Sequence, residues 1–172
     1  MNIVNISAYK FADIPSPADW RSALKDRGDE LGLLGSILLA PEGINLFLAG
    51  ERTAIDSYVE FLRSDELFGG RFSDIPVKES ITDYQPFKRM VVRLKKEIIT
   101  MKHPMIRPAD TRASAIDART LKRWLDQGHD DTGREVVLLD TRNQYEVDIG
   151  TFKNAVSLQI DIFSEFPQAL QN

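Results

Sequence analysis

The chain has 172 residues, of which 42% are hydrophobic and 28% charged, and its net charge is −4. This composition is typical of a globular protein, and it argues against a disordered chain and against one coated in nucleic acid over its whole surface. The chain contains no cysteine, which excludes disulfides, thiolate metal sites and a cysteine nucleophile among these residues.

Neither a membrane span nor a secretory signal is visible. The longest apolar runs, such as residues 37–40, are far shorter than the roughly 20 residues that cross a bilayer. Residues 1–10 lack the basic and apolar regions of a signal peptide. We therefore expect a cytoplasmic protein that has no membrane partner.

Residues 1–100 carry strand and helix patterns in an order that predicts an α+β domain. Trp20, Leu24 and Leu31 recur at helical spacing after Pro17, and the turn 41–43 separates two short apolar runs as in a hairpin. The expected elements are a strand over 3–11, a helix over 17–31, strands over 36–40 and 44–49, a helix around 55–62, and strands over 76–81 and 89–98. The order β-α-β-β-α-β is that of the ferredoxin-like, or acylphosphatase-like, fold.

A second, α/β unit is expected over residues 115–172, after a linker over 101–114 that contains two prolines. Asp117 can cap a helix, and the continuous apolar run 136–139 predicts a parallel strand covered on both faces. Asp140 then lies at the carboxyl end of that strand, where open α/β sheets place their sites. Further short helices and a strand are expected up to residue 170.

Three stretches of this chain, in the same order, resemble the rhodanese-containing tRNA uridine hydroxylases. They are Leu39-Ala40-Pro41-Glu42-Gly43-Ile44-Asn45, residues 87–99 (FKRMVVRLKKEII), and Leu139-Asp140-Thr141-Arg142-Asn143 with the downstream Tyr145-Glu146, Gly150 to Ala155 and Phe163 to Pro167. The resemblance implies a ferredoxin-like domain followed by the first half of a rhodanese-like parallel-sheet domain. It also implies oxygen-dependent formation of 5-hydroxyuridine at the wobble position of tRNA, with molecular oxygen as co-substrate.

In that family a cysteine loop follows the strand that comes next after residue 172, and it surrounds a thiolate or persulfide with backbone N–H groups. This sequence ends at Asn172, so it contains no catalytic cysteine. We therefore expect that the chain alone catalyses neither hydroxylation nor sulfur transfer. The part of a rhodanese sheet that remains would leave an open apolar flank, which predicts a homodimer or local instability.

The strongest local charge bias lies in residues 88–107, which hold seven lysines and arginines against one acid, Glu97. If 89–95 is a strand, Met90, Val92 and Leu94 face the core. The opposite face would then carry a basic stripe that can hold phosphates, with a solvated strand face as the alternative. The candidate substrate-binding residues are Lys88, Arg89, Arg93 and Lys95 in this segment, together with Glu42 and Asn45 in the hairpin turn. Tyr84 and Phe87 can stack bases or pack at strand ends.

Near the expected place of the cysteine loop, Asp140 and Arg142 are expected to form an internal ion pair, with Glu146 bracing the same turn. No metal site is visible, because His103 and His129 have no ligand partners at metal spacing. No cofactor motif is visible either. Two alternatives remain for the function: a thiosulfate-type sulfurtransferase, and an RNA-binding module without catalysis.

Overall fold

The computed structural model describes residues 2–99 and 113–171, which belong to two separate units. The expected linker over 101–114 lies outside the described residues, apart from Ala113 and Ser114. Lys102, His103 and Arg107 also lie outside them. None of the described helices is both long and apolar enough to cross a bilayer.

The first unit is built on a five-stranded sheet with the order β4-β1-β3-β2-β5. Its elements are β1 (Ile3–Phe11), α1 (Pro17–Glu30), β2 (Leu34–Ala40), β3 (Gly43–Gly50), α2 (Arg52–Ser64), the 3-10 turn η1 (Glu66–Phe68), β4 (Val77–Thr82) and β5 (Met90–Leu94). The first four strands are antiparallel neighbours in the ferredoxin-like order, and β5 extends the sheet parallel to β2. The predicted ferredoxin-like fold is confirmed, whereas the last strand ends at Leu94 rather than at residue 98.

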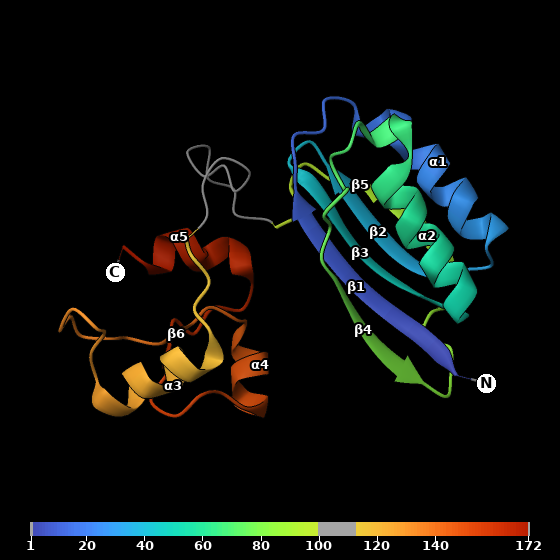
Figure 1. The fold of residues 1–172 in the computed structure, drawn as a ribbon. Coiled ribbons are helices and arrows are strands. Elements are labelled where there is room, and N and C mark those ends of the chain that lie inside the picture. Colours follow the sequence, from blue (N-terminus) through green and yellow to red (C-terminus); the bar gives the residue numbers. More distant parts are fainter. Residues whose placement is uncertain (1, 100–112, 172) are drawn as a thin grey trace. The chain divides into compact units, whose positions relative to one another are not determined.

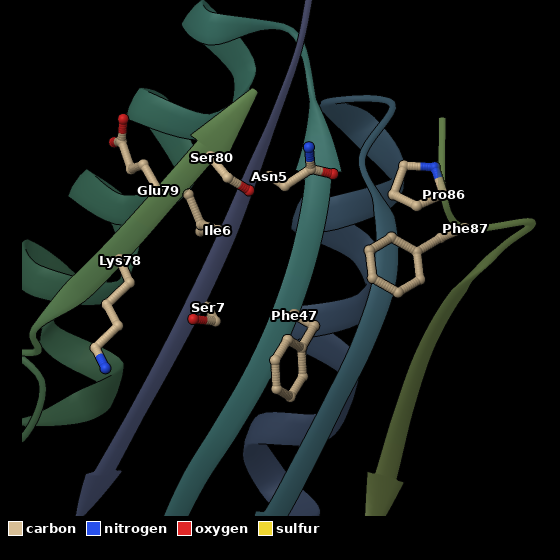
Figure 2. Close-up of a pocket in the computed structure, with 9 residues that line it drawn as sticks. All are labelled: Asn5, Ile6, Ser7, Phe47, Lys78, Glu79, Ser80, Pro86 and Phe87. Carbon is tan, nitrogen blue, oxygen red and sulfur yellow. The ribbon is translucent and has the colours of Figure 1, made fainter. Parts of the chain in front are cut away.

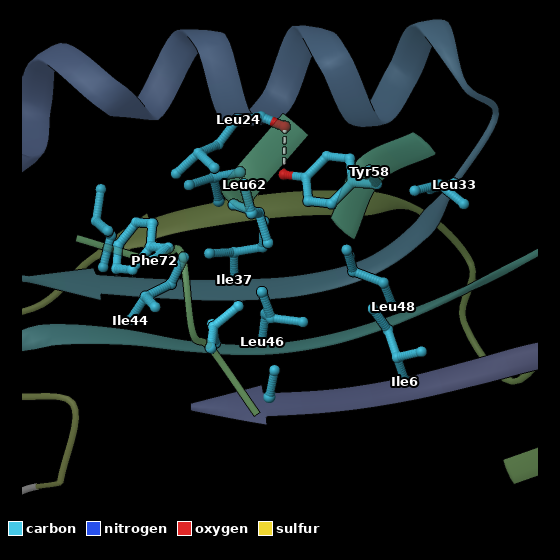
Figure 3. Close-up of a cluster of buried hydrophobic side chains, with 14 of the residues drawn as sticks. Ile6, Leu24, Leu33, Ile37, Ile44, Leu46, Leu48, Tyr58, Leu62 and Phe72 are labelled. Atoms are coloured by element: carbon cyan, nitrogen blue, oxygen red, sulfur yellow. Dashed lines mark hydrogen bonds between the residues drawn. The ribbon is translucent and has the colours of Figure 1, made fainter. Parts of the chain in front are cut away.

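Helices α1 and α2 cover one face of this sheet (Figure 1). Alternation along the strands sends Ile6, Ile37 and Leu46 into the layer beneath the helices, where each is at most 3% exposed. From α2, the fully buried Tyr58 donates its hydroxyl hydrogen to the carbonyl of Leu24 in α1 at 2.9 Å (Figure 3). Burial raises the pKa of the Tyr58 phenol, which therefore stays a neutral donor that joins the two helices.

The hairpin between β2 and β3 depends on Gly43, which follows a two-residue turn. Gly43 has a φ of 150°, and a Cβ placed there would lie 2.2 Å from the main-chain oxygen of Lys10 on β1. Only glycine therefore allows β3 to pair this closely with β1. The main-chain oxygens of Pro41 and Glu42 in the turn accept hydrogen bonds from Ile14 (2.8 Å) and Ala12 (3.0 Å), which anchors the turn to the chain that leaves β1.

The second unit has little regular structure. It comprises α3 (Ala118–Gln127), β6 (Leu139–Asp140), α4 (Gln144–Ile149), β7 (Val156–Ser157), the 3-10 turn η2 (Phe163–Glu165) and α5 (Phe166–Ala169). The Asp117 cap is confirmed, because its carboxylate accepts from the amides of Arg119 at 3.0 Å and Thr120 at 3.1 Å. Strands β6 and β7 pair in parallel through two residues each.

The expected buried strand over 136–139 is wrong in both length and burial. Only Leu139 and Asp140 form β6, and Val137 is 66% exposed. A parallel strand is buried when neighbouring strands and helices cover it, and here β6 has only the short β7 as a described partner. The predicted homodimer through this unit stays a prediction.

Candidate nucleic-acid interface

The face of the first sheet opposite the helices, here called the open face, has no helix of the first unit packed over it (Figure 1). Strand alternation and register send Asn5, Ser7 and Tyr9 of β1 to this face, together with their cross-strand partners. The partners are Asn45 and Phe47 on β3, Ser36 and Leu38 on β2, Lys78 and Ser80 on β4, and Val91 and Arg93 on β5. In the described strands the open face carries two cations, Lys78 and Arg93, and no carboxylate.

A hollow of about 390 Å³ lies on the open face around Phe47, and we call it the Phe47 hollow. Phe47 and Phe87 project from the same side of the sheet there, with Lys78 on the opposite flank (Figure 2). Phe47 is 47% exposed, and its ring contacts no other aromatic ring of the described residues. Its cross-strand partners are Ser7 and Ser36, whose short side chains leave the ring uncovered.

The segment after β4 forms one wall of this hollow because Gln85 fastens it to β3. Gln85 Nε2 donates to the main-chain oxygen of Ala49 at 3.2 Å, and Gln85 Oε1 accepts from the amide of Phe87 at 3.2 Å. These bonds hold Pro86 and Phe87 at the edge of the hollow (Figure 2). The Phe87 ring is thereby positioned by a loop that Gln85 holds through two hydrogen bonds to the backbone.

Asn5 is one of the residues that line the hollow, and its amide is held in one orientation. The Thr82 hydroxyl donates its one hydrogen to the carbonyl of Tyr84 at 2.7 Å, so it can only accept from Asn5 Nδ2, which lies 2.9 Å away. This fixes the orientation of the Asn5 amide and leaves Oδ1 as the acceptor. Oδ1 is buried and has no partner among the described residues, and an unpaired buried acceptor costs free energy.

The hairpin-turn prediction for Glu42 and Asn45 is partly wrong. Asn45 is the third residue of β3, where it pairs with Tyr9 and Leu38 and faces the open side. Glu42 is in the turn, but its Oε1 accepts hydrogen bonds from the amides of Ile98 at 2.6 Å and Ile99 at 3.4 Å. The Glu42 carboxylate therefore ties the turn to the chain beyond β5, which is a structural task.

The basic segment is exposed, and it only partly follows the predicted strand pattern. Met90 and Val92 are buried as expected, whereas Leu94 is 43% exposed because it ends an edge strand that has a neighbour on one side only. Arg93 lies beside Leu38 on the open face. The cations of this segment that the structure describes are all exposed, and none pairs with a carboxylate of another described residue: Lys88, Arg89, Arg93, Lys95 and Lys96.

The structure brings Arg93 and Asn45 into one cross-sheet row with Leu38 and Tyr9. Lys88 and Arg89 lie just before β5 and Lys95 just after it. The sequence analysis missed Phe47 and Lys78. The alternation along β3 could have revealed Phe47, because it lies between the buried Leu46 and Leu48 and therefore faces the opposite side of the sheet.

In the second unit, Asp140 and Arg142 form the expected ion pair, with Nη2–Oδ2 at 2.6 Å and Nε–Oδ1 at 2.9 Å. The Asp140 side chain is 7% exposed and that of Arg142 is 44% exposed, so the pair is only half buried. Hydrogen bonds from Arg142 and from Thr151 lower the pKa of the Asp140 carboxyl below its usual range. Arg142 also donates to the Gly150 carbonyl at 2.7 Å.

Glu146 braces the same turn, since its Oε2 accepts from the amide of Asn143 at 3.3 Å. Asp140, Arg142 and Glu146 thus hold the connection between β6 and α4 in shape, and none of them is placed as a nucleophile. Within the described ranges 2–99 and 113–171, no group of three or more potential metal ligands comes together.

The strand order, with two helices on one face, defines the first unit as an acylphosphatase-like domain of the ferredoxin-like class. A family model described as the UPF0176 acylphosphatase like domain matches residues 3–98. The chain belongs to this UPF0176 family.

Curated relatives match almost the whole chain. A protein of Burkholderia pseudomallei (strain 1106a), named tRNA uridine(34) hydroxylase, is 59% identical over 171 residues, which is 99% of this chain and 57% of the relative. A protein of the same name from Burkholderia thailandensis is 58% identical over 99% of this chain and 58% of its own length. The chain therefore spans a little over half the length of these relatives. Among solved structures, an acylphosphatase of Coxiella burnetii is 17% identical, with a TM-score of 0.38 over 54% of this chain and 93% of its own.

Proposed function

We propose that this chain is the tRNA-recognising part of an enzyme that hydroxylates uridine 34, the wobble position of tRNA, at carbon 5. The observation that carries this proposal is the 59% identity over 99% of the chain to a relative named for that activity. Molecular oxygen is the proposed co-substrate, and the cytoplasm, where tRNA is modified, is the proposed compartment. The chain contains no cysteine, so its own residues bind and orient the tRNA rather than form a covalent intermediate on sulfur.

The second unit is proposed to be the beginning of a rhodanese-like domain. The parallel pair β6-β7 and the Asp140–Arg142 ion pair at the end of β6 support this assignment. An Asp and Arg pair of this kind fixes the backbone at the carboxyl end of a strand, where open α/β sheets hold their catalytic loops. The role proposed for Asp140, Arg142 and Glu146 is to position such a loop, not to react.

The basic segment around β5 is the proposed phosphate-binding site. Its cations are exposed and have no carboxylate partner among the described residues, so their charge is available to an anionic ligand. Contacts between such cations and phosphates release counterions, which makes binding fall steeply with salt. A local patch of this kind is compatible with the net charge of −4, because the patch rather than the total charge meets the ligand.

The test is tRNA binding by the 172-residue chain over a range of salt concentrations, with the triple variant Lys88→Ala, Arg89→Ala, Arg93→Ala. Each lost phosphate contact makes the negative slope of log K against log salt shallower by about 0.7 to 0.9. We therefore expect the magnitude of the slope to fall by about 2 to 3 in the triple variant. An unchanged affinity and slope in the variant would place tRNA recognition outside this segment.

The matched control removes the same amount of charge elsewhere, through Lys25→Ala, Arg27→Ala and Arg119→Ala, and should leave the slope unchanged. The hydroxylation itself is tested in a host that lacks the modification, by mass spectrometry of its tRNA nucleosides. The Burkholderia pseudomallei relative should restore 5-hydroxyuridine, and this chain alone should not. Hydroxylation by the 172-residue chain alone would refute the proposed division of labour.

A further inference from the structure

We infer that the open face of the first sheet is a platform for single-stranded RNA, on which Phe47 and Phe87 stack unpaired bases. The inference rests on the proposed function, because it names the surface that would take an unpaired loop of the tRNA. The open face shares Arg93 with the phosphate-binding segment around β5, and it adds contacts to bases.

The aromatic side chains of this face are presented as base stacking requires. Phe47 stands in the central strand between Ser7 and Ser36, which leaves its ring 47% exposed. Tyr9, 43% exposed on the neighbouring strand, lies further along the same face. Ferredoxin-like sheets that bind RNA use aromatic residues on their central strands in this way, one base per ring. An exposed phenylalanine in the middle of a sheet is otherwise costly, because its apolar surface remains in contact with water.

The charges of the face favour a polyanion over a peptide. Lys78 lies on β4 at one edge and Arg93 on β5 at the other, and no carboxylate projects between them in the described strands. A strand of RNA crossing the sheet would place its bases over the aromatic centre and its phosphates near these two cations. The nearest acid in the lining of the hollow, Glu79, is bound in a bidentate pair by Arg52 at 2.9 and 3.0 Å.

Asn5 is held in one orientation in the lining of the Phe47 hollow. Asn5 Oδ1 is fixed as an acceptor by the Thr82 hydroxyl and has no partner among the described residues. The Asn5 side chain points toward the wall formed by Pro86 and Phe87 (Figure 2). Because Oδ1 is buried, Asn5 shapes the lining of the hollow and does not itself offer a contact to a base. The hollow therefore takes an unpaired base by stacking on Phe47, without selecting among the four bases.

The experiment measures binding of a fluorescently labelled single-stranded heptauridine to the 172-residue chain by anisotropy. Phe47→Leu keeps an apolar side chain but removes the ring, and should weaken binding about 5-fold to 150-fold, the loss of one stacked base. Phe47→Tyr keeps the ring and should bind within about 2-fold of the parent chain. The control Phe152→Leu changes a 65% exposed aromatic residue of the second unit and should have no effect.

Folding is checked by the thermal midpoint of each variant, and Phe47→Tyr separates loss of the ring from a folding defect. Addition of heptauridine should also shift the amide resonances of Ser7 and Ser36, which flank Phe47. Equal binding by Phe47→Leu and the parent chain, or shifts confined to the segment around β5, would overturn the inference. Tight binding of an acidic peptide with no binding of heptauridine would overturn it in favour of a protein partner.

The two proposals fail separately. If the longer relative hydroxylates tRNA but Phe47→Leu leaves heptauridine binding unchanged, the platform is wrong and the proposed function stands. If heptauridine binding depends on Phe47 but the relative leaves tRNA unmodified, the platform stands and the proposed function is wrong.

Discussion

The replacement Glu42→Ala decides whether this turn residue recognises substrate or holds the fold. Its carboxylate accepts from the amides of Ile98 at 2.6 Å and Ile99 at 3.4 Å, across 56 and 57 residues of sequence. Ile98 is 7% exposed, so its N–H has little access to water once the acceptor is removed. The structural interpretation predicts that the chain beyond β5 detaches more often, while RNA affinity is unchanged.

The expected magnitude follows from the shorter of the two bonds. A hydrogen bond to a charged acceptor contributes about 1.5 to 3 kcal/mol, and the contact at 3.4 Å adds little because it lies at the limit of bonding distance. Since 1.4 kcal/mol corresponds to a factor of ten, the amides of Ile98 and Ile99 should exchange about 10-fold to 150-fold faster in Glu42→Ala. Glu42→Gln retains a neutral acceptor, so it should lower the free energy of this local opening by only about 0.5 to 1.5 kcal/mol.

The assay is amide hydrogen exchange followed by NMR, because exchange reports the local opening at Ile98 and Ile99, which a global unfolding midpoint does not resolve. Glu30→Ala, which removes an exposed carboxylate of α1, serves as the control and should leave both amides unchanged. If Glu42→Ala exchanges like the parent chain at these amides and instead loses tRNA affinity, the structural assignment is wrong and Glu42 contacts the substrate.

Three further predictions test the fold. Gly43→Ala forces a Cβ against a main-chain oxygen of β1, 2.2 Å away, and should destabilise the first unit by about 1 to 3 kcal/mol, seen as a lower thermal midpoint. A midpoint equal to the parent's would contradict the close approach. Tyr58→Phe removes the hydroxyl bonded to Leu24 and should cost about 0.5 to 1.5 kcal/mol in urea denaturation, whereas no change would mean that this bond is not formed. The pKa of Asp140 is held low by Arg142, so the pair should contribute fully above about pH 4 and be lost only as pH falls through the lowered pKa, as followed by NMR titration. Loss of the pair already near pH 5 would show that Arg142 does not lower the pKa of Asp140.

The local pattern of the sequence was sufficient to predict most elements of the first unit. The strand over 3–11, the helix after Pro17 and the helix around Tyr58 depend on spacing and on residues at element ends, which act over a few positions. The same reasoning predicted the Asp117 cap and the ion pair of Asp140, since both join residues close in sequence.

The second unit shows where such local reasoning was insufficient. The apolar run 136–139 predicts a buried strand only if other elements cover it, and sequence spacing does not reveal whether they do. In the structure β6 is two residues long and Val137 is exposed. Burial depends on partners that lie elsewhere in the chain, and the spacing within one segment does not reveal them.

The sequence by itself determined the order of elements, the helix faces and the exposed basic segment around β5. Tertiary structure alone decided the partner of Glu42 and the layout of the open face, where Phe47 lies between serines of two other strands. It also gathered Asn5, Lys78 and Phe87 around one hollow. Strand register and loop closure bring these residues together from positions far apart in the chain, and neither is encoded in the spacing of a single segment.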